Sequence, residues 1–358
     1  MDRLIGALGV NVWMWLWLIF FFPSLGALAA EPEVEADLKA LKNTAARDEA
    51  DSAIRGGLTW LVAQQDTKNG NFGPKLPHAY TALSCLALLA AGEQPGRSEY
   101  GDALRKGILY LADKASRGRG YLGGDGSRMY GHGIATLALC EAYGMLDSPE
   151  ANKRVGEAAA AALRVTIQAQ VRQNGPHRGG WRYEPDSRDA DLSVTAWQVL
   201  TLRAAKNCGF DIPDRVIQDA LDYVRGLHSG AGFSYQQGRP PTPAMQAAGI
   251  VCLKIMGADT SAADKAKIAT AAKSLEKSDN SRGRNYYYEN YYLAMAGTML
   301  GDALSSSVLP QLEKSLMRLQ REDGQFDRHT GNDGGVYATA FAVVCLSAHY
   351  HYLPVTQE

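Results

Sequence analysis

A loop motif that recurs along the chain constrains its fold more than any other feature. An amphipathic segment ends in Gln or another polar residue, Gly and an aromatic residue follow, and an Ala-rich apolar segment then begins near Thr-Ala. The first copy contains Gly70-Asn71-Phe72 and the last contains Gly324-Gln325-Phe326, whereas the copy around Tyr286 lacks the Gly. The aromatic residues fall at positions 72, 121, 181, 233, 286 and 326, so neighbouring copies lie 40 to 60 residues apart. This spacing is close to that of helix-pair repeats.

The physical properties of the repeat indicate paired antiparallel helices. No segment sustains the alternation of a β-strand, and each half of a copy has room for an ordinary helix. The loop Gly permits the positive φ that reverses the chain, the aromatic ring fills the gap between neighbouring pairs, and the Gln can bond to helix ends. An array of such pairs stays open as a solenoid or closes into a ring, and closure buries its two apolar end faces. Since neither end carries a polar capping repeat, we predict a closed all-α toroid, (α/α)6, over residues 53–358.

The first thirty residues have the order of a secretory signal. Arg3 precedes an apolar run from Leu4 to Phe22, and small residues around Ala29 offer a cleavage site. The alternative is an uncleaved membrane anchor, since the run approaches the ~20 residues that span a bilayer. Either reading predicts an exported protein, periplasmic or extracellular, which contacts a membrane only through this segment and only if the segment is uncleaved. Residues 31–52 are predicted to form a charged helix or linker.

Composition limits the partners of the chain. Apolar residues make up 46% of the 358 residues and charged residues 21%, so a large core can form. The net charge is −1 without a cluster of Lys or Arg, which argues against nucleic acid. The five cysteines fall mostly inside apolar helical runs and lack metal-site spacing. We therefore expect free core thiols.

The repeat resembles that of squalene–hopene cyclases and protein prenyltransferase β subunits. The residues that carry the resemblance are Trp60, Gln64 and Gly70-Asn71-Phe72 in the first copy, and Gly179-Gly180-Trp181-Arg182-Tyr183 in the third. The similarity extends over roughly residues 50 to 353. It implies an (α/α)6 toroid in which the second helix of each pair lines the inside.

The chemistry that the resemblance implies is altered at its central motif. Class II terpene cyclases are expected to carry Asp-x-Asp-Asp followed by Thr-Ala, whereas this chain has Asp189-Ala190-Asp191-Leu192-Ser193-Val194 before Thr195-Ala196. In those cyclases the middle Asp of the motif is the proton donor. Aligned on Thr195-Ala196, this position is Ser193 here, and Asp191 and Asp189 remain as the candidate catalytic acids. The zinc site of prenyltransferases needs a Cys that this stretch lacks. We therefore predict neither a metal nor another cofactor.

Several further residues lie where the second helix of a pair is expected to begin. If the ring closes, they converge on one mouth of a central cavity, where aromatic walls with a few polar groups suit a ligand. The same residue types also cap and pack helices, so a purely structural role stays open. These cavity candidates are His78, Tyr80, Tyr130, His132, Trp181, Tyr291, Asp333 and Tyr337.

The sequence leaves the activity open. The leading interpretation is an extracytoplasmic toroid that binds a ligand or protein partner without the classical catalytic motif. The ligand would be a hydrophobic small molecule such as an isoprenoid, a peptide or a saccharide. The first alternative is a diverged terpenoid cyclase or isoprenoid transferase that uses Asp191 or Asp189. The second is a glycan-active toroid enzyme, which needs paired carboxylates.

Overall fold

The computed structural model describes residues 32–278, 285–301, 303–327 and 335–350, together with Leu353 and Val355. The chain divides into two compact units, residues 1–48 and 49–358. The described part of the first unit is the beginning of helix α1 (Pro32–Ala63), which covers most of the predicted charged segment. The predicted signal, residues 1–30, lies outside the described residues. Within the described part of the chain, no helix combines the length and apolar character needed to cross a membrane.

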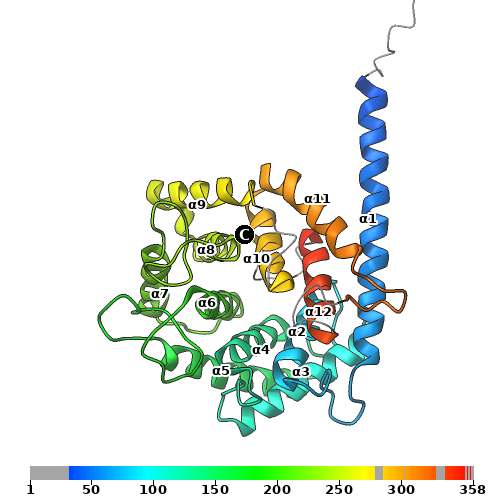
Figure 1. Ribbon diagram of the computed structural model, residues 1–358. Coiled ribbons are helices and arrows are strands. Elements are labelled where there is room, and N and C mark those ends of the chain that lie inside the picture. Colours follow the sequence, from blue (N-terminus) through cyan, green and yellow to red (C-terminus); the bar gives the residue numbers. More distant parts are fainter. Residues whose placement is uncertain are drawn as a thin grey trace, which may run out of the picture. The chain divides into compact units, whose positions relative to one another are not determined.

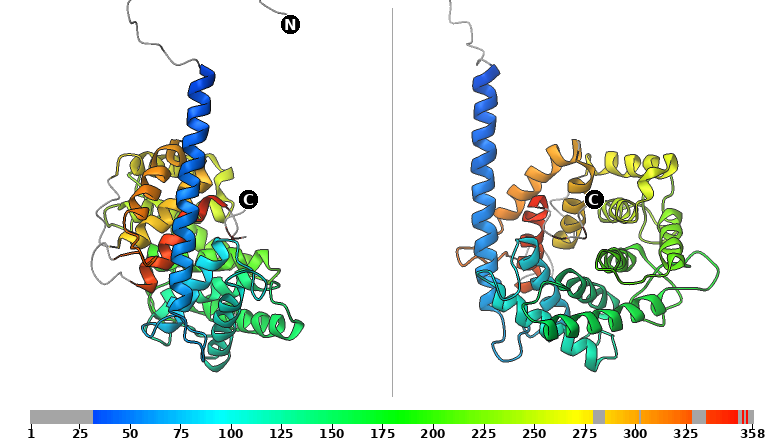
Figure 2. Two further views of the ribbon diagram at one scale, coloured as in Figure 1. Left: turned by 90° about the vertical axis from the view of Figure 1, so that its right-hand side faces the viewer. Right: turned by 180° about the vertical axis from the view of Figure 1, so that it is seen from behind.

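The second unit is a ring of helix pairs (Figure 1). The inner helices are α2 (Pro77–Ala90), α4 (Arg128–Ala142), α6 (Leu192–Asn207), α8 (Pro243–Ile255), α10 (Tyr286–Leu300) and α12 (Val336–Leu346). The outer helices are the end of α1, α3 (Gly101–Arg117), α5 (Pro149–Ala169), α7 (Asp214–Gly226), α9 (Ala262–Leu275) and α11 (Ala303–Met317). Each inner helix packs on the next, and α12 packs on α2. The ring is therefore closed, as Figure 2 also shows from behind, and the predicted all-α toroid is confirmed.

The two helix layers differ in how they are buried. Every residue of α6 from Leu192 to Leu202 is buried, whereas α7 buries only Val216, Ala220, Leu221, Tyr223 and Val224. A helix that is apolar around its circumference is stable only inside a protein, and one with a single apolar stripe belongs at the surface. The distribution of apolar residues therefore places the Ala-rich helices inside the ring.

The loop glycines are needed for both conformation and space. The following have φ between 85° and 93°, where a side chain is strained: Gly70, Gly120, Gly179 and Gly324. A Cβ on Gly179 would lie 1.9 Å from the Asp219 carbonyl oxygen in α7, and one on Gly324 would lie 2.2 Å from that of Gly56 in α1. Each loop therefore packs directly on the backbone of the next outer helix.

A polar side chain near the start of the inner helix holds the buried loop residue. The backbone N–H groups of Phe72, Trp181 and Phe326 donate to the hydroxyl oxygens of Thr81, Thr195 and Thr339, at 2.9 to 3.0 Å. In the fourth repeat the acceptor of the Phe233 N–H is Gln246 Oε1, at 2.8 Å, and in the second repeat the acceptor is His132. We call this place the loop-acceptor position; it consists of Thr81, His132, Thr195, Gln246 and Thr339.

The second repeat differs from the sequence expectation. Leu122, rather than Tyr121, donates its N–H to His132 Nδ1, at 3.3 Å, and is fully buried. Tyr121 is only half-buried. In the Gly-x-aromatic spacing, the second residue after the positive-φ glycine fills the gap between helix pairs. After Gly120 that residue is Leu122, so an aliphatic side chain fills the gap in the second repeat.

Gln320 joins the last repeat to the first outer helix and so closes the ring. Gln320 Nε2 donates to the Gly324 carbonyl, at 3.2 Å, and to that of Ala53 in α1, at 2.7 Å. Gln170 makes the same two kinds of bond, to the carbonyls of Gly179 at 3.0 Å and Val216 at 2.8 Å. The last repeat therefore bonds to the first outer helix, α1, in the same way as the third repeat bonds to the next outer helix, α7.

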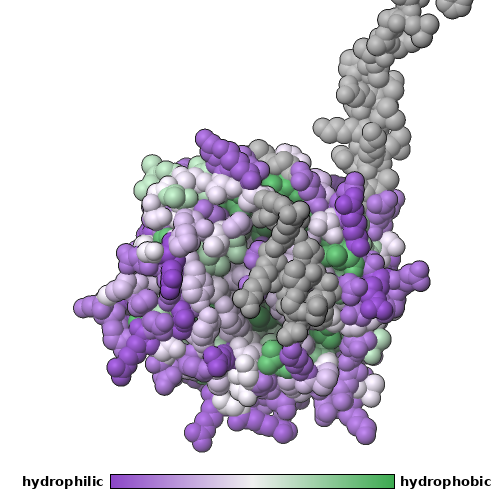
Figure 3. Space-filling model, in the orientation of Figure 1, coloured by the Kyte–Doolittle hydropathy of each residue, from purple (hydrophilic) through white to green (hydrophobic). Residues whose placement is uncertain are grey.

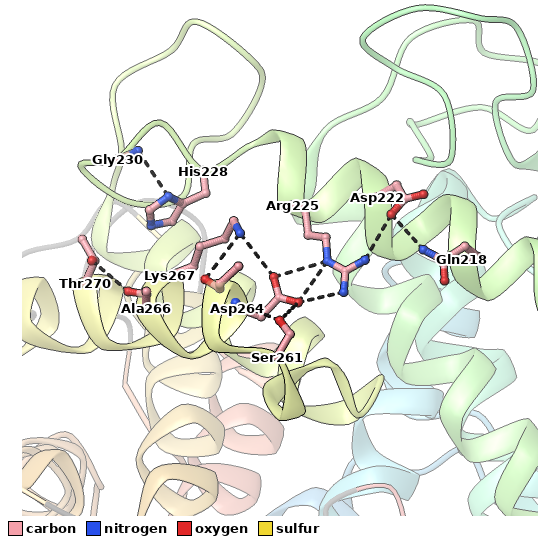
Figure 4. Close-up of polar contacts among 11 residues, drawn as sticks. Gln218, Asp222, Arg225, His228, Gly230, Ser261, Asp264, Ala266, Lys267 and Thr270 are labelled. Carbon is pink, nitrogen blue, oxygen red and sulfur yellow. Dashed lines mark hydrogen bonds and ion pairs between the residues drawn. The ribbon is translucent and has the colours of Figure 1, made fainter.

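An ion cluster joins two outer helices (Figure 4). Asp264 in α9 is buried and lies 2.7 Å from Arg225 Nη2 in α7 and 3.3 Å from Lys267 Nζ. The hydrogen bonds from Arg225 are the main cause that lowers the pKa of Asp264 to about 2. The five cysteines are free thiols; Cys208 is half-buried and the other four are buried.

Candidate functional site

A cavity of about 860 Å³ lies at the centre of the ring, where the inner helices begin. Figure 3 shows hydrophilic side chains over the periphery of one face of the molecule and apolar ones toward its middle. Every inner helix contributes to the lining, which is rich in aromatic rings: Tyr80, Tyr130, Tyr183, Trp197, Tyr235, Tyr288, Tyr337 and Phe341. Volume and lining are those of a small-molecule site.

Helical geometry explains which residues face the cavity. Two residues along an α-helix are separated by about 200°, so a side chain two positions from the loop-acceptor position lies on the opposite face of the helix. The residues two positions before it are Ala79, Tyr130, Ser193, Ala244 and Tyr337, and all line the cavity. Two positions after it, Leu83, Ile134, Trp197 and Phe341 form a second layer. The loop contact therefore sets the register of the cavity wall.

A chain of hydrogen bonds leads from the cavity to a buried carboxyl group. The Tyr130 hydroxyl lies 2.5 Å from Ser193 Oγ, which donates to Asp191 Oδ1 at 2.6 Å. Asp191 is fully buried and also accepts from the Val194 N–H, at 2.9 Å, as the N-cap of α6. Burial raises the pKa of Asp191, although its hydrogen bonds and Arg182 oppose that shift.

Arg182 connects the two candidate acids. Its Nη1 lies 3.4 Å from Asp191 Oδ2, and its Nε lies 3.5 Å from Asp189 Oδ2. The guanidinium also stacks over the rings of Tyr183 and Tyr235, at 4.5 and 5.7 Å from their centroids. Asp189 is 49% exposed, and neither carboxylate is among the residues that line the cavity.

Comparison with known proteins agrees with this architecture. A family model described as the prenyltransferase α-α toroid domain matches residues 186–290 and 285–355. The second half of the chain therefore matches the prenyltransferase α-α toroid family. A search of curated proteins found no match to this toroid.

Three solved structures, of two proteins, share the fold of this toroid. The GH76A α-1,6-mannanase from Salegentibacter sp. superposes with a TM-score of 0.59 at 12% identity, over 85% of this chain and 99% of that chain. A variant of the type II terpene cyclase MstE from Scytonema, with its product merosterolic acid A, gives 0.55 at 16% identity, over 87% and 99%. Another variant, with its substrate geranylgeranyl dihydroxybenzoate, gives 0.52 at 15% identity, over 87% and 100%. At these identities the likeness concerns the fold alone.

The predicted cavity residues separate into two groups in the toroid. Tyr80, Tyr130 and Tyr337 line the cavity. Tyr291 is buried behind the wall and stacks on Trp197, with ring centroids 4.9 Å apart. Asp333 lies outside the described residues.

The other predicted residues hold the loops of the toroid. Trp181 is the buried loop residue of the third repeat, and its Nε1 donates to the Thr166 carbonyl at 2.7 Å. His78 Nδ1 lies 3.0 Å from the Leu122 carbonyl oxygen. These contacts assign the two side chains to the framework around the site.

His132 is a neutral framework group. Because Nδ1 accepts from the Leu122 N–H, Nε2 carries the proton and donates to Thr166 Oγ1, 3.0 Å away. Burial lowers the pKa of His132 to about 3. The His132 imidazole is therefore uncharged at neutral pH and does not reach the cavity lining.

Sequence reasoning missed several lining residues, among them Tyr183, Trp197, Tyr235, Tyr288 and Glu289. Trp197 and Ser193 could have been found, because they flank Thr195 by two positions in the Thr-Ala signal. Burial raises the pKa of Glu289. Among the described residues of the toroid, no cluster of three or more His, Cys, Asp or Glu side chains could hold a metal ion.

Proposed function

We propose that this toroid is an extracytoplasmic binding protein for a hydrophobic small molecule of the isoprenoid class. The observation that carries the proposal is the central cavity of about 860 Å³ with its aromatic wall. Ligand pockets of drug-sized molecules span roughly 300–1,000 Å³ and are lined mainly by apolar and aromatic side chains. A flexible hydrocarbon chain gains about 0.8 kcal/mol for each methylene that leaves water, so such a wall favours a long apolar ligand.

One of the two solved proteins that share the fold supports this ligand class. The Scytonema cyclase structures contain a geranylgeranyl substrate and a merosterolic acid product. Location outside the cytoplasm is part of the proposal and rests on the signal-like residues 1–30. N-terminal sequencing of protein recovered from the extracytoplasmic fraction tests it, and a mature terminus near Ala30 is the expected result.

A second candidate is catalysis by proton transfer, as in a diverged terpenoid cyclase or isoprenoid transferase. Asp191 does not line the cavity, so it has no direct contact with a ligand there. The observation in favour is the hydrogen-bonded path from Asp191 through Ser193 to Tyr130, which joins a carboxyl group of raised pKa to the cavity wall. Such a path can carry a proton to or from a bound molecule.

Cavity filling tests the binding proposal. Ala79 and Ala244 face the cavity, so Ala79→Trp and Ala244→Trp should occupy the space of a ligand. The control is Ala263→Trp, at an exposed position on α9. Native mass spectrometry after incubation with lipid and glycan extracts should show an isoprenoid adduct on the wild type and the control, and none on the filled variants.

The same experiment separates the alternatives. Recovery of a chemically altered isoprenoid that disappears with Asp191→Asn would establish the catalytic candidate. An adduct of saccharide instead of isoprenoid, or an isoprenoid adduct that survives both filled variants, contradicts the proposed function.

A further inference from the structure

The inner helices begin at the mouth of the cavity, an arrangement that ordinarily attracts anions. Free N–H groups and the positive end of the helix dipole make a helix N-terminus a binding site for phosphate or carboxylate. Here several of these donors already have partners. In α2, the N–H groups of His78 and Ala79 donate to Asp125 Oδ2, at 2.7 and 3.3 Å. In α4, the Met129 N–H donates to the Tyr183 carbonyl, at 2.9 Å.

Some N–H groups at the start of the next two inner helices also have partners. In α6, the Leu192 N–H donates to the Tyr235 carbonyl at 2.9 Å, and Val194 donates to Asp191. In α8, Thr242 Oγ1 accepts from Met245, at 3.4 Å. Two of these caps are carboxylates, Asp125 and Asp191, which offset the positive helix ends. In these four helices of the described structure, the capped N–H groups are therefore not open to a diphosphate.

The Tyr130 hydroxyl group on this wall is oriented as an acceptor toward the cavity. Asp191 Oδ1 accepts from the Val194 N–H, so Ser193 must use its only proton on Asp191. The Tyr130 hydroxyl, 2.5 Å from Ser193 Oγ, then donates its own proton to Ser193. Only lone pairs of Tyr130 Oη remain for the cavity. The order of donors holds whether or not Asp191 is protonated, because a proton would reside on Oδ2.

A neighbouring side chain has the same polarity. Ser127 lines the cavity one turn before Tyr130, and its hydroxyl donates to Asp125. Ser127 Oγ is thus a second acceptor toward the cavity. Glu289, across the ring in α10, adds a carboxyl group to the lining.

The cations at the rim do not reverse this preference. Arg128 is exposed and pairs with Glu184, with Nε 3.1 Å from Oε1. Lys75 is exposed to solvent at the edge of the cavity. Charges so exposed are screened by water and salt, and they interact weakly with a ligand group.

We propose that the ligand of the cavity is an uncharged isoprenoid alcohol, whose hydroxyl group donates a hydrogen bond to Tyr130 Oη. This inference rests on the proposed function and narrows it. A prenyl ether has no proton to donate, and a prenyl diphosphate would bring negative charge to the acceptors Tyr130 Oη and Ser127 Oγ. Neither supplies a hydrogen-bond donor to the lone pairs of Tyr130 Oη.

Three probes with one hydrocarbon chain test the inference: farnesol, farnesyl methyl ether and farnesyl diphosphate. Binding to the full-length protein is measured by quenching of tryptophan fluorescence, since Trp197 lines the cavity. We expect farnesol to bind about tenfold more tightly than the ether, which corresponds to about 1.4 kcal/mol for one hydrogen bond. The diphosphate should bind more weakly than farnesol.

Two variants assign the preference to Tyr130. Tyr130→Phe should make farnesol and the ether bind equally. Ser193→Ala removes the acceptor of the Tyr130 proton, so Tyr130 can donate, and affinity for the ether should rise toward that for farnesol. Tyr143→Phe is the control, since it removes a hydroxyl at an exposed position that does not line the cavity and should keep the tenfold preference.

The outcomes separate the inference from the proposed function. If none of the probes binds, the proposed function fails. If all bind but the diphosphate or ether is the tightest, the cavity binds isoprenoids and the alcohol assignment is wrong. A farnesol preference that persists in Tyr130→Phe also overturns the assignment.

Discussion

The buried histidine of the second repeat allows a quantitative test of the loop-acceptor position. His132 occupies a place that Thr or Gln holds in other repeats, and it must stay neutral to accept from Leu122. Burial lowers its pKa from 6.5 to about 3. The unfolded chain therefore binds a proton below pH 6.5 that the folded protein refuses until about pH 3. The stability linked to His132 is present above pH 6.5 and is lost as the pH falls toward 3.

The size of the effect follows from linkage. Stability falls by about 1.4 kcal/mol for each pH unit while one proton separates the two states. Between pH 7.5 and 4.5 only the two units below 6.5 count, which gives about 2.7 kcal/mol. His132→Gln keeps an acceptor for Leu122 and a donor for Thr166 but cannot titrate. Its stability should change less with pH than that of the wild type by this amount.

Urea unfolding at pH 7.5, 6.0, 5.0 and 4.5 measures the difference. Groups that titrate elsewhere cancel when the variant is subtracted from the wild type. We expect the variant to be less stable at pH 7.5, by about 1 kcal/mol for the poorer hydrogen bonds, and more stable than the wild type at pH 4.5. The reverse change Gln246→His should introduce the same dependence at the equivalent position of the fourth repeat. A wild-type-minus-variant difference that is constant across this range would refute the buried neutral imidazole.

Three further predictions concern the framework. Gln320→Ala breaks the two bonds that close the ring and should cost about 2 kcal/mol in urea unfolding, whereas Gln64→Ala, at an exposed site, should change stability by less than about 0.5 kcal/mol. Gly179→Ala combines a positive φ with a contact of 1.9 Å, whereas Gly144→Ala has a similar φ of 87° and open space. Gly144→Ala should cost roughly 1 kcal/mol of backbone strain. Gly179→Ala should cost clearly more and should therefore lower the melting temperature further. Asp264→Asn should remove stability that is present above pH 3.8 and lost as the pH falls toward 2, at most about 2 kcal/mol, checked by acid titration of ellipticity.

Much of the fold could be predicted from the sequence because the repeat carries its own physical constraints. The Gly at 70, 179 and 324 is required by backbone contact with the next helix, and the following buried residue requires an acceptor in the inner helix. These requirements recur, so a single chain shows them several times. The sequence pattern predicts Tyr121 as the gap-filling residue of the second loop because an aromatic ring follows Gly120, but in the structure Leu122 fills the gap. The position of a residue relative to Gly, and not its type, determines which side chain fills the gap.

The site was harder to predict for a geometric reason. The start of an inner helix contains residues that point toward the loop and residues that point toward the cavity, and a shift of two positions reverses the direction. Trp181 and His132 are large, polar-tipped side chains near such starts, yet they face the framework. Tyr130 lies two residues before His132 and therefore faces the cavity. The face of the inner helix that points to the loop is fixed by the contact of Thr195. Only the structure shows this contact, in which the Thr195 hydroxyl accepts from the Trp181 N–H.

The same rule explains why the altered acidic motif changes the chemistry of the cavity. Counting back from Thr195, the residue that faces the cavity is Ser193, and Asp191 lies a further two positions away, where it caps α6 in full burial. A carboxyl group at the position of Ser193 would touch a ligand directly, whereas one at Asp191 acts only through the hydrogen bonds it accepts. Through Ser193 it orients the Tyr130 hydroxyl, and through Val194 it occupies the helix end. Asp191 thus lies outside the cavity lining, caps the start of α6 and, through Ser193, leaves an acceptor on the wall. These three consequences together favour a neutral hydrogen-bond donor as the ligand.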